Sequence, residues 1–428
     1  MIARGEEGLA GGGKWNNGFT WVVDTNVARE ACLVLGADEV LGNDTAPASS
    51  QPILTSSCPG WVCYAEKTHP YVLPHLSKVK SPQALMGTVL KTTLSRTLGI
   101  PPSRIWHLSI MPCFDKKLEA SREELTDSVW DGDGTPGRGI RDVDCVITSK
   151  EIFMLMESRG LDFFSIPKEP LPSNQHIRFP DPILEPFLFP QRRAHRSPPE
   201  AGSSGGNLYF LLQSVASRHP GSQIQQVRGR NADVVEYTVS AAGGELLFKA
   251  ARYYGFRNIQ NLVRRLKPAR PSRMPGGKPF GSARRPTGKP AGLEFAYVEV
   301  MACPGGCTNG GGQAKVDDQV ILDQRGLAGK PGPDEQKQWL AEIDEAYFSA
   351  DDASGSSDGP GKIAADIVDG ISPSYIRDVL AYWSRSTSIG IDRLAFTSYR
   401  EVVSDVGKSK ASDTERVIQL AGKIGGGW

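Results

Sequence analysis

The sequence predicts an α/β protein of two lobes, followed by a smaller C-terminal region. Its 428 residues are enough for two or three domains with a sizeable core. Short strand-like segments alternate with amphipathic helical ones, which favours an α/β lobe with a largely parallel sheet. A proline-rich break divides the pattern. We predict a first lobe at 15–165, a linker at 166–206, a second lobe at 207–346, and a linker with a tail region at 347–428.

Within the first lobe, the clearest element is the helix that begins at Ser81-Pro82. Serine is a common N-cap, and proline fits the first helical position. Leu85, Met86 and Val89 then fall on one helical face. The other elements expected here are strands at 19–23, 51–55, 104–110 and 143–148, and helices at 26–35 and 151–158.

The second lobe follows a stretch that closes with Ser-Pro-Pro-Glu-Ala-Gly-Ser-Ser-Gly-Gly, which indicates an extended connection. We expect helices at 207–217, 245–253, 258–266 and 313–324, and strands at 234–239 and 293–300. An Asp-, Ser- and Gly-rich linker at 350–361 precedes a helix at 375–383.

Composition narrows the class of protein. The net charge of +1 creates no global field for nucleic acid or membrane. Seven cysteines are too few for a disulfide scaffold and odd in number, which fits a reducing compartment. We find no stretch of about 18 apolar residues, so no membrane span is expected. We expect a cytoplasmic protein, with the nucleus as an alternative.

Four cysteines stand in three motifs far apart in the chain. The motifs are Thr55-Ser-Ser-Cys58-Pro-Gly-Trp61, Met111-Pro-Cys113-Phe-Asp-Lys116-Lys-Leu-Glu119, and Glu299-Val-Met-Ala-Cys303-Pro-Gly-Gly-Cys307-Thr-Asn-Gly-Gly-Gly-Gln313. Four thiolates are the ligand set of a cubane iron–sulfur cluster. Each motif places a cysteine just past a predicted strand, and sites in open α/β sheets form beyond the carboxyl ends of strands.

The alternative is that these are scattered structural cysteines, because cysteine is often buried and no compact CxxC pair is present. The loop glycines at 310–312 favour the cluster, since they let the backbone approach a bulky group. We assign Cys32, Cys63 and Cys145 to the core, with Cys63 as a reserve ligand.

All three motifs resemble the signature motifs of the H-cluster domain of [FeFe] hydrogenases. They are more similar still to the cytosolic iron-only-hydrogenase-like proteins, also called nuclear prelamin A recognition factor-like. The resemblance covers 19–326, with a weaker match at 397–402. It implies two α/β lobes of hydrogenase-like fold with a [4Fe–4S] cluster between them.

The resemblance also assigns roles by residue. Its cluster ligands match Cys58, Cys113, Cys303 and Cys307. Two methionines and a lysine would lie in the same pocket as cofactor-binding residues, and a glutamate matches a proton-path residue: Met111, Met301, Lys116 and Glu119. Solvated helix positions are the alternative for Lys116 and Glu119.

The chain departs from the hydrogenases at Ser57, where they carry a proton-relaying thiol. A serine hydroxyl is a poor relay at neutral pH, because its pKa lies far above the roughly 8.5 of cysteine. We therefore expect a single cubane without a di-iron subsite, in a non-catalytic protein. An iron-only hydrogenase-type redox enzyme is the alternative, and a cluster-free interaction protein is a third.

The function implied is a carrier in cytosolic and nuclear iron–sulfur protein assembly. Its partners would be the β-propeller and HEAT-repeat subunits of a targeting complex and apo iron–sulfur client proteins. The cytosolic relatives carry a ferredoxin-like four-cysteine site ahead of this domain. Only Cys32 precedes Cys58 here, so we expect a chain that lacks this site, through truncation or an incomplete gene model.

Two further features have competing interpretations. The segment Arg264–Lys289 holds nine Lys or Arg and no acid. Because aromatics for base stacking are nearly absent, we favour a solvated insertion over a nucleic-acid patch or nuclear signal. The terminal Gly-Gly-Gly-Trp428 could dock into a partner's pocket or be a frayed end.

Overall fold

The structure, a computed structural model, describes residues 19–43, 47–49, 51–126, 139–166, 177–190, 198–229, 231–267, 294–327, 329–349 and 366–403. Several predictions concern other residues. The glycine-rich N-terminus, the basic segment beyond residue 267, the linker at 350–361 and Trp428 all lie outside the described residues.

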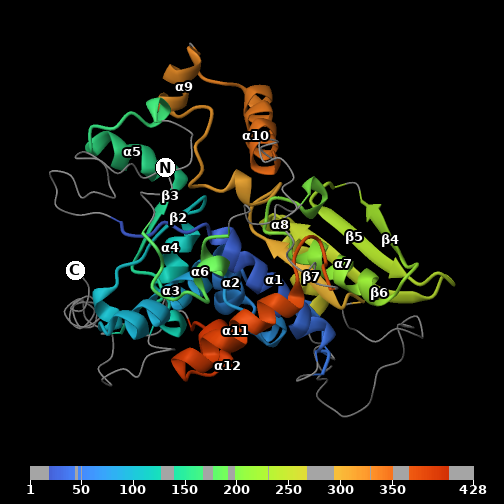
Figure 1. The fold of residues 1–428 in the computed structure, drawn as a ribbon. Helices are drawn as coiled ribbons and strands as arrows, with labels where there is room; N and C mark the ends of the chain where they lie inside the picture. The colour runs from blue at the N-terminus through green and yellow to red at the C-terminus, as the bar shows by residue number, and fades with distance from the viewer. Residues whose placement is uncertain are drawn as a thin grey trace, which may run out of the picture.

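Helices are the main regular structure of the described chain, and Figure 1 shows them arranged around two sheets. No helix of the described ranges is both long and apolar enough to cross a membrane. The α-helices are α1 (Thr25–Leu41), α2 (Pro59–Thr68), α3 (Pro82–Leu98), α4 (Asp115–Ala120), α5 (Ser149–Ser158), α6 (Glu185–Leu188), α7 (Asn207–Arg218), α8 (Phe256–Leu266), α9 (Gln319–Arg325), α10 (Pro333–Phe348), α11 (Pro373–Thr387) and α12 (Ile391–Ala395). As predicted, Ser81 caps α3, and its side chain accepts a hydrogen bond from Ala84 N.

The strands form two sheets. The larger has the order β1-β7-β6-β5-β4, in which β1, β7 and β6 run parallel and the other neighbours antiparallel. The smaller pairs β2 with β3 in parallel. The bounds are β1 (Ile53–Leu54), β2 (Leu108–Met111), β3 (Cys145–Thr148), β4 (Gln223–Arg228), β5 (Val234–Ser240), β6 (Leu246–Tyr254) and β7 (Tyr297–Met301). We expected the first region to form one largely parallel sheet. Its strands β2 and β3 do pair in parallel, but β1 joins the larger sheet beside β7 of the second region.

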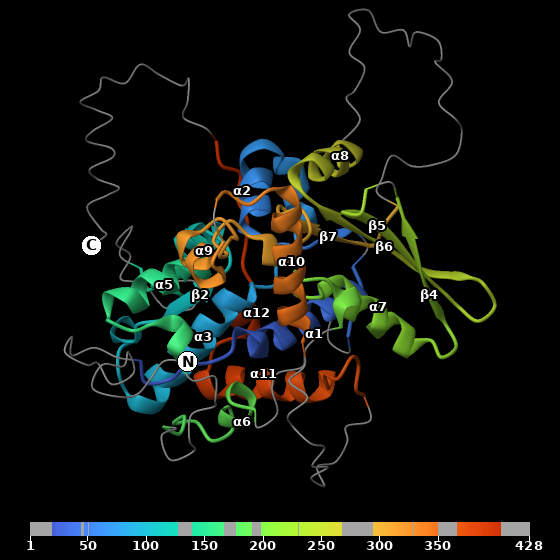
Figure 2. The same cartoon turned by 90° about the horizontal axis from the view of Figure 1, so that it is seen from above.

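Helices cover both faces of the larger sheet, because alternate side chains of a strand point to opposite faces. On β7, Tyr297 joins the apolar core formed with α1 and α7, whereas Val298 and Val300 join the core formed with α2 and α8. Figure 2 shows α7 and α8 on either side of this sheet. The smaller sheet lies beside α3, α4 and α5 (Figure 1).

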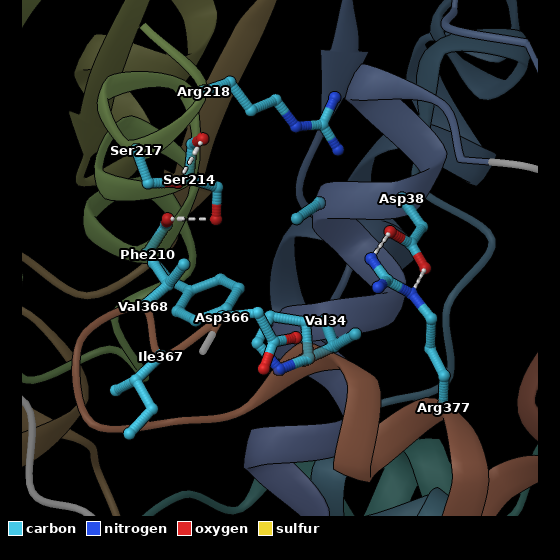
Figure 3. A pocket seen from close by; sticks show the side chains of 12 residues that line it. Val34, Asp38, Phe210, Ser214, Ser217, Arg218, Asp366, Ile367, Val368 and Arg377 are labelled. Carbon is cyan, nitrogen blue, oxygen red and sulfur yellow. Dashed lines mark hydrogen bonds and ion pairs between the residues drawn. The ribbon is translucent and has the colours of Figure 1, made fainter. Parts of the chain in front are cut away.

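The C-terminal helix α11 packs against α1 and α3. Trp383 is buried there, and its indole Nε1 donates to Thr92 Oγ1 at 2.8 Å. At the rim of a cavity between α1, α7 and α11, Arg377 binds both carboxylate oxygens of Asp38, at 2.7 and 3.0 Å (Figure 3). Such a bidentate pair fixes the orientation of the two helices. The tail region is therefore an integral part of the core.

The segment 177–190 also contributes to this core, although we expected the whole stretch 166–206 to be an extended connection. Phe179, Leu184, Phe187 and Leu188 are buried against the helices. The buried carboxylate of Asp181 fixes the segment, since it accepts hydrogen bonds from Tyr382 on α11 and from Arg96 on α3.

Two predicted elements are wrong. Residues 245–253 form the strand β6 and not a helix, because pairing with β5 and β7 buries their apolar side chains on both faces and overrides the helix propensity of Leu, Lys and Ala. Residues 19–23 form no strand. They approach the N-cap Asp24 in extended form, with Trp21 and Val23 packed on the core.

The packing of α11 on the core can be tested through the stability of the protein. We expect Trp383→Ala to lower the free energy of unfolding by about 3–5 kcal/mol, because it leaves a large cavity and removes the hydrogen bond to Thr92. Denaturant titration measures the change. Tyr375→Ala, at a 45% exposed position of the same helix, should have little effect. Equal effects of the two substitutions would contradict the described packing.

Candidate metal centre

The three cysteine motifs leave the carboxyl ends of three strands, as predicted. Cys58 follows β1, Cys113 follows β2, and Cys303 follows β7. Because β1 and β7 are parallel neighbours, their two loops emerge at the same edge of the larger sheet. The loop after β2 comes from the smaller sheet. The site therefore depends on contact between loops of the two sheets.

Glycines allow that contact. Gly312 N donates to Pro112 O at 3.0 Å and thereby joins the Cys307 loop to the Cys113 loop. A Cβ atom at Gly310 would lie 2.3 Å from Pro112 O, and one at Gly312 would lie 2.5 Å from Thr148 Cγ2. Both distances are far below van der Waals contact, so any larger residue would push the loops apart. The glycine run thus has a packing role beside the predicted approach to a ligand.

A second close approach joins the loops of Cys58 and Cys113. A Cβ atom at Gly60 would lie 2.6 Å from Asp115 Oδ2 and 3.5 Å from Ala302 Cβ. Backbone N–H groups also point at two of the thiols. Ala302 N donates to Cys58 Sγ at 3.4 Å, and Asp115 N donates to Cys113 Sγ at 3.3 Å. Such donors stabilise a thiolate.

The four thiols affect one another electrostatically, as groups gathered in one place do. Burial raises the pKa of Cys58, Cys303 and Cys307 to about 11 each, and it raises that of Cys113 as well. Repulsion from Cys307 adds to the rise at Cys58, repulsion from Cys58 adds to that at Cys113 and Cys303, and repulsion from Cys303 adds to that at Cys307. Four thiolates in this place therefore need a compensating positive charge.

Lys116 supplies positive charge at the site. Its Nζ donates to Ser57 O at 3.0 Å and to Glu119 Oε2 at 2.9 Å, and its side chain is 14% exposed. It lowers the pKa of Cys58, Cys113 and Cys307, against the larger effect of burial. Glu119 is buried and also accepts hydrogen bonds from Ser81 and Gln83. The alternative of solvated helix positions is therefore wrong for both residues.

The other residues predicted for the site are near the cysteines in sequence, and the protein shields them from solvent. Met111 and Met301 are buried at the ends of β2 and β7. Ser57 Oγ is buried and has no hydrogen-bond partner among the described residues. A hydroxyl in that condition has an unused proton beside Cys58, which a ligand atom could accept.

The donor set fits a cluster better than a single ion. Within the described ranges, no group of three or more His, Cys, Asp or Glu side chains could hold one metal ion. Ligands of a single zinc ion would all lie about 2.3 Å from one centre. In a cubane, by contrast, each of four thiolates binds a separate iron. The donor set has the chemistry that a cubane uses: cysteine thiols, backbone N–H donors to two of them, and the largely enclosed ammonium of Lys116.

The other three cysteines do not follow the prediction uniformly. Cys32 is buried in the core, as expected, and its thiol donates to Lys80 O at 3.2 Å. Cys63 and Cys145 are only half-buried, so the prediction of a core position is wrong for them. Cys63 is not among the buried residues of α2, three of which, Trp61, Val62 and Ala65, join the core at the larger sheet.

Two features of the site were missed by reasoning from the sequence. Ser203 and Ser204, in the stretch expected to be a linker, contact the Cys303–Cys307 loop. Helix α10 covers the same loop, where Asp344 accepts a hydrogen bond from Thr308 at 2.5 Å and Leu340 lies against Gly305. The Ser-Ser-Gly-Gly run ahead of α7 could have signalled a close approach of two loops instead of a flexible connection.

Comparisons with known proteins agree with this geometry. The family model for the iron-only hydrogenase large subunit, C-terminal domain, matches residues 14–311. The cytosolic Fe-S cluster assembly factor nar-1 of Neurospora crassa is 70% identical over 428 residues, which cover 99% of this chain and 73% of that protein. The cytosolic Fe-S cluster assembly factor NAR1 of Chaetomium globosum is 68% identical, over 100% of this chain and 73% of that protein.

Solved structures with a similar fold are [FeFe]-hydrogenases. A variant of apo HydA1 from Chlamydomonas reinhardtii superposes with a TM-score of 0.59 at 21% identity, over 93% of this chain and 88% of that one. A second [FeFe]-hydrogenase chain gives a TM-score of 0.59 at 20% identity, over 90% and 86%. These structures confirm the predicted hydrogenase-like α/β fold. Together with the sequence matches, they show that the chain belongs to the iron-only hydrogenase C-terminal domain family, in the group of the cytosolic Fe-S cluster assembly factors named Nar1.

Proposed function

We propose that this protein is an iron–sulfur component of cytosolic iron–sulfur protein assembly, and that it carries a [4Fe–4S] cluster on Cys58, Cys113, Cys303 and Cys307. The observation that carries the proposal is the close packing against one another of the three loops that contain these four cysteines. The two lobes, 15–165 and 207–346, would enclose the cluster, each with two ligands. Because the ligands must lose protons to bind, cluster uptake would be coupled to folding of the site.

We assign supporting roles to three further residues. Lys116 would offset part of the negative charge of the four thiolates, since its ammonium is fixed by Glu119 and the Ser57 carbonyl. Met111 and Met301, both buried, would form part of the apolar wall that keeps water from the cluster. A dry, positively charged surrounding is a common means of setting the properties of a metal centre.

The hydrogenase alternative is weaker on two counts. Ser57 stands where a hydrogenase has its proton-relaying thiol, and a hydroxyl of high pKa does not take up that role near neutral pH. The curated relatives at 70% and 68% identity are called assembly factors. The name of those relatives supports a function of this protein in the cytosol, together with other proteins of iron–sulfur cluster assembly.

The identity of the partners is a further part of the proposal. A protein that carries a buried cluster needs one partner that delivers the cluster and others that present the recipient proteins. We propose the β-propeller and HEAT-repeat subunits of the targeting complex, and apo iron–sulfur client proteins, with activity in the nucleus as well as the cytosol. Copurification of these subunits with the tagged chain tests this part, and their absence under conditions that retain the cluster would contradict it.

The ligand assignment is tested by Cys303→Ser. Wild-type protein purified anaerobically should hold about four irons and four sulfides per chain. The substitution should remove most of both, because a cubane that loses one thiolate is poorly retained. Iron and sulfide analysis measures this. The control is Cys63→Ser, which changes a half-buried cysteine of α2. Iron lost equally in both variants, or in neither, would refute the assignment.

The role of Lys116 is tested by its replacement with methionine, which keeps the length of the side chain and removes the charge. We expect iron to be lost to a chelator about 10-fold faster, the lower end of the usual effect of groups that surround metal ligands. The matched control is Lys117→Met, on the same helix but 40% exposed and paired with Glu151. Equal rates for Lys116→Met and wild type would argue against the assigned role.

The hydrogenase alternative makes a distinct spectroscopic prediction. A di-iron subsite carries CO and CN ligands, whose stretching bands appear in the infrared. We expect no such bands in protein purified anaerobically from its own organism, since Ser57 fits a cubane without that subsite. An authentic [FeFe] hydrogenase, purified and measured in the same way, provides the positive control. Bands in the native protein would favour the redox enzyme.

A further inference from the structure

A buried chain of polar side chains extends from the larger sheet to the Cys307 loop. Its base is Glu299 on β7, which is fully buried on the face of the sheet that α7 covers. Glu299 Oε2 accepts from Leu208 N at 2.9 Å, and Oε1 accepts from the Tyr254 hydroxyl at 2.6 Å. Tyr254, at the end of β6, is itself 2% exposed. Buried polar groups of this kind need a stated partner or purpose.

The next members of the chain are Ser203 and Ser204, in the turn before α7. This turn presses directly against the cysteine loop. A Cβ atom at Gly306 would lie 2.3 Å from Ser203 Oγ and 3.2 Å from Ser204 Oγ, and Gly306 has a φ of +111° that excludes most side chains. Thr308 has one hydroxyl proton, which goes to Asp344, so Ser203 Oγ can offer its own proton to Thr308 Oγ1 at 2.9 Å or to Gly305 O at 3.4 Å. Ser203 is therefore occupied by the loop backbone and Thr308.

Ser204 is not occupied in this way. Its Oγ is buried and has no hydrogen-bond partner, sulfur included, among the described residues. Its polar neighbours are the Tyr254 phenol and the Cys307 thiol, and its hydroxyl lowers the pKa of both, against the larger effect of burial. A Cβ atom at the preceding Gly202 would come within 3.5 Å of the Tyr254 hydroxyl, which places the turn beside this residue.

Counting protons decides how Ser204 must point. Tyr254 has one hydroxyl proton and gives it to Glu299, so it can offer Ser204 only a lone pair. Ser204 also has one proton, which can go to the phenol oxygen or to the sulfur of Cys307. A neutral thiol is a weak acceptor, but a thiolate bears a negative charge and attracts the proton strongly. A cysteine bound to iron is a thiolate, so the unpartnered Ser204 hydroxyl, which lies against Gly306 of the same loop, would donate to the sulfur of a cluster-bound Cys307.

We propose that Ser204 is a positioning residue of the cluster site: its hydroxyl donates a hydrogen bond to the thiolate of Cys307, and the phenol oxygen of Tyr254 is the competing acceptor. The inference rests on the proposed function, because it requires Cys307 to be a cluster ligand. Its consequence concerns the reduction potential. A hydrogen bond to a ligand sulfur stabilises the reduced cluster, which is the more negative state, and so raises the potential.

The test compares Ser204→Ala with the matched neighbour Ser203→Ala in the full chain, each reconstituted anaerobically with iron and sulfide. Iron content establishes that the cluster is present, and a redox titration followed by EPR gives the potential. We expect Ser204→Ala to keep about four irons and to become harder to reduce by about tenfold in the equilibrium constant, which is about 59 mV for one electron. Ser203→Ala should keep the wild-type potential.

Rescue separates the hydrogen bond from a packing effect. Ser204→Thr keeps the hydroxyl and should restore the potential of wild type, whereas a loss caused by altered loop packing would persist. Tyr254→Phe removes the competing acceptor and should leave the potential unchanged or slightly higher. A wild-type potential in Ser204→Ala, or an equal shift in Ser203→Ala, would overturn the inference. Failure of the wild-type chain itself to take up a cluster would contradict the proposed function and, with it, the premise of the inference.

Discussion

The close packing of three loops against one another is the constraint on which the site depends. Cys58 and Cys303 emerge from neighbouring parallel strands, but Cys113 comes from a separate sheet. The hydrogen bond from Gly312 N to Pro112 O and the lack of side chains at Gly60, Gly310 and Gly312 allow these loops to meet. The glycines of the motifs are therefore as necessary as the cysteines, since a single added Cβ would meet backbone or side-chain atoms at less than 3 Å.

Electrostatics imposes the second condition. Burial is the main cause that raises the pKa of the four thiols, to about 11 for three of them, and repulsion between the thiols adds to it. In the proposed site, an iron–sulfur cluster would supply the positive charge that ionises them, and Lys116 would contribute from the protein side. Backbone donors from Ala302 and Asp115 act on two of the sulfurs.

Much of this could be predicted from the sequence, because the cysteine motifs are local and the strand ends that carry them follow from simple alternation. The start of α3 at Ser81-Pro82 could also be predicted from the sequence. The failures have a common cause. Residues 245–253 contain good helix formers, and only their neighbours β5 and β7 make them a strand. The sequence around Ser203 and Ser204 is typical of a linker, and only the structure shows that the Cys303–Cys307 loop contacts these two residues. Both depend on contacts between residues distant in sequence.

The core that surrounds the centre extends beyond the lobes that carry the ligands, since α11 packs on α1 and α3 and α10 covers the Cys307 loop. The central claim is that four thiols from three loops hold one cluster. Anomalous diffraction at the iron edge from anaerobically grown crystals tests it most directly. We predict iron density resolved as one cubane, bonded to Cys58, Cys113, Cys303 and Cys307. A single metal ion, or a cluster bonded through Cys63 in place of any of these, would contradict the account.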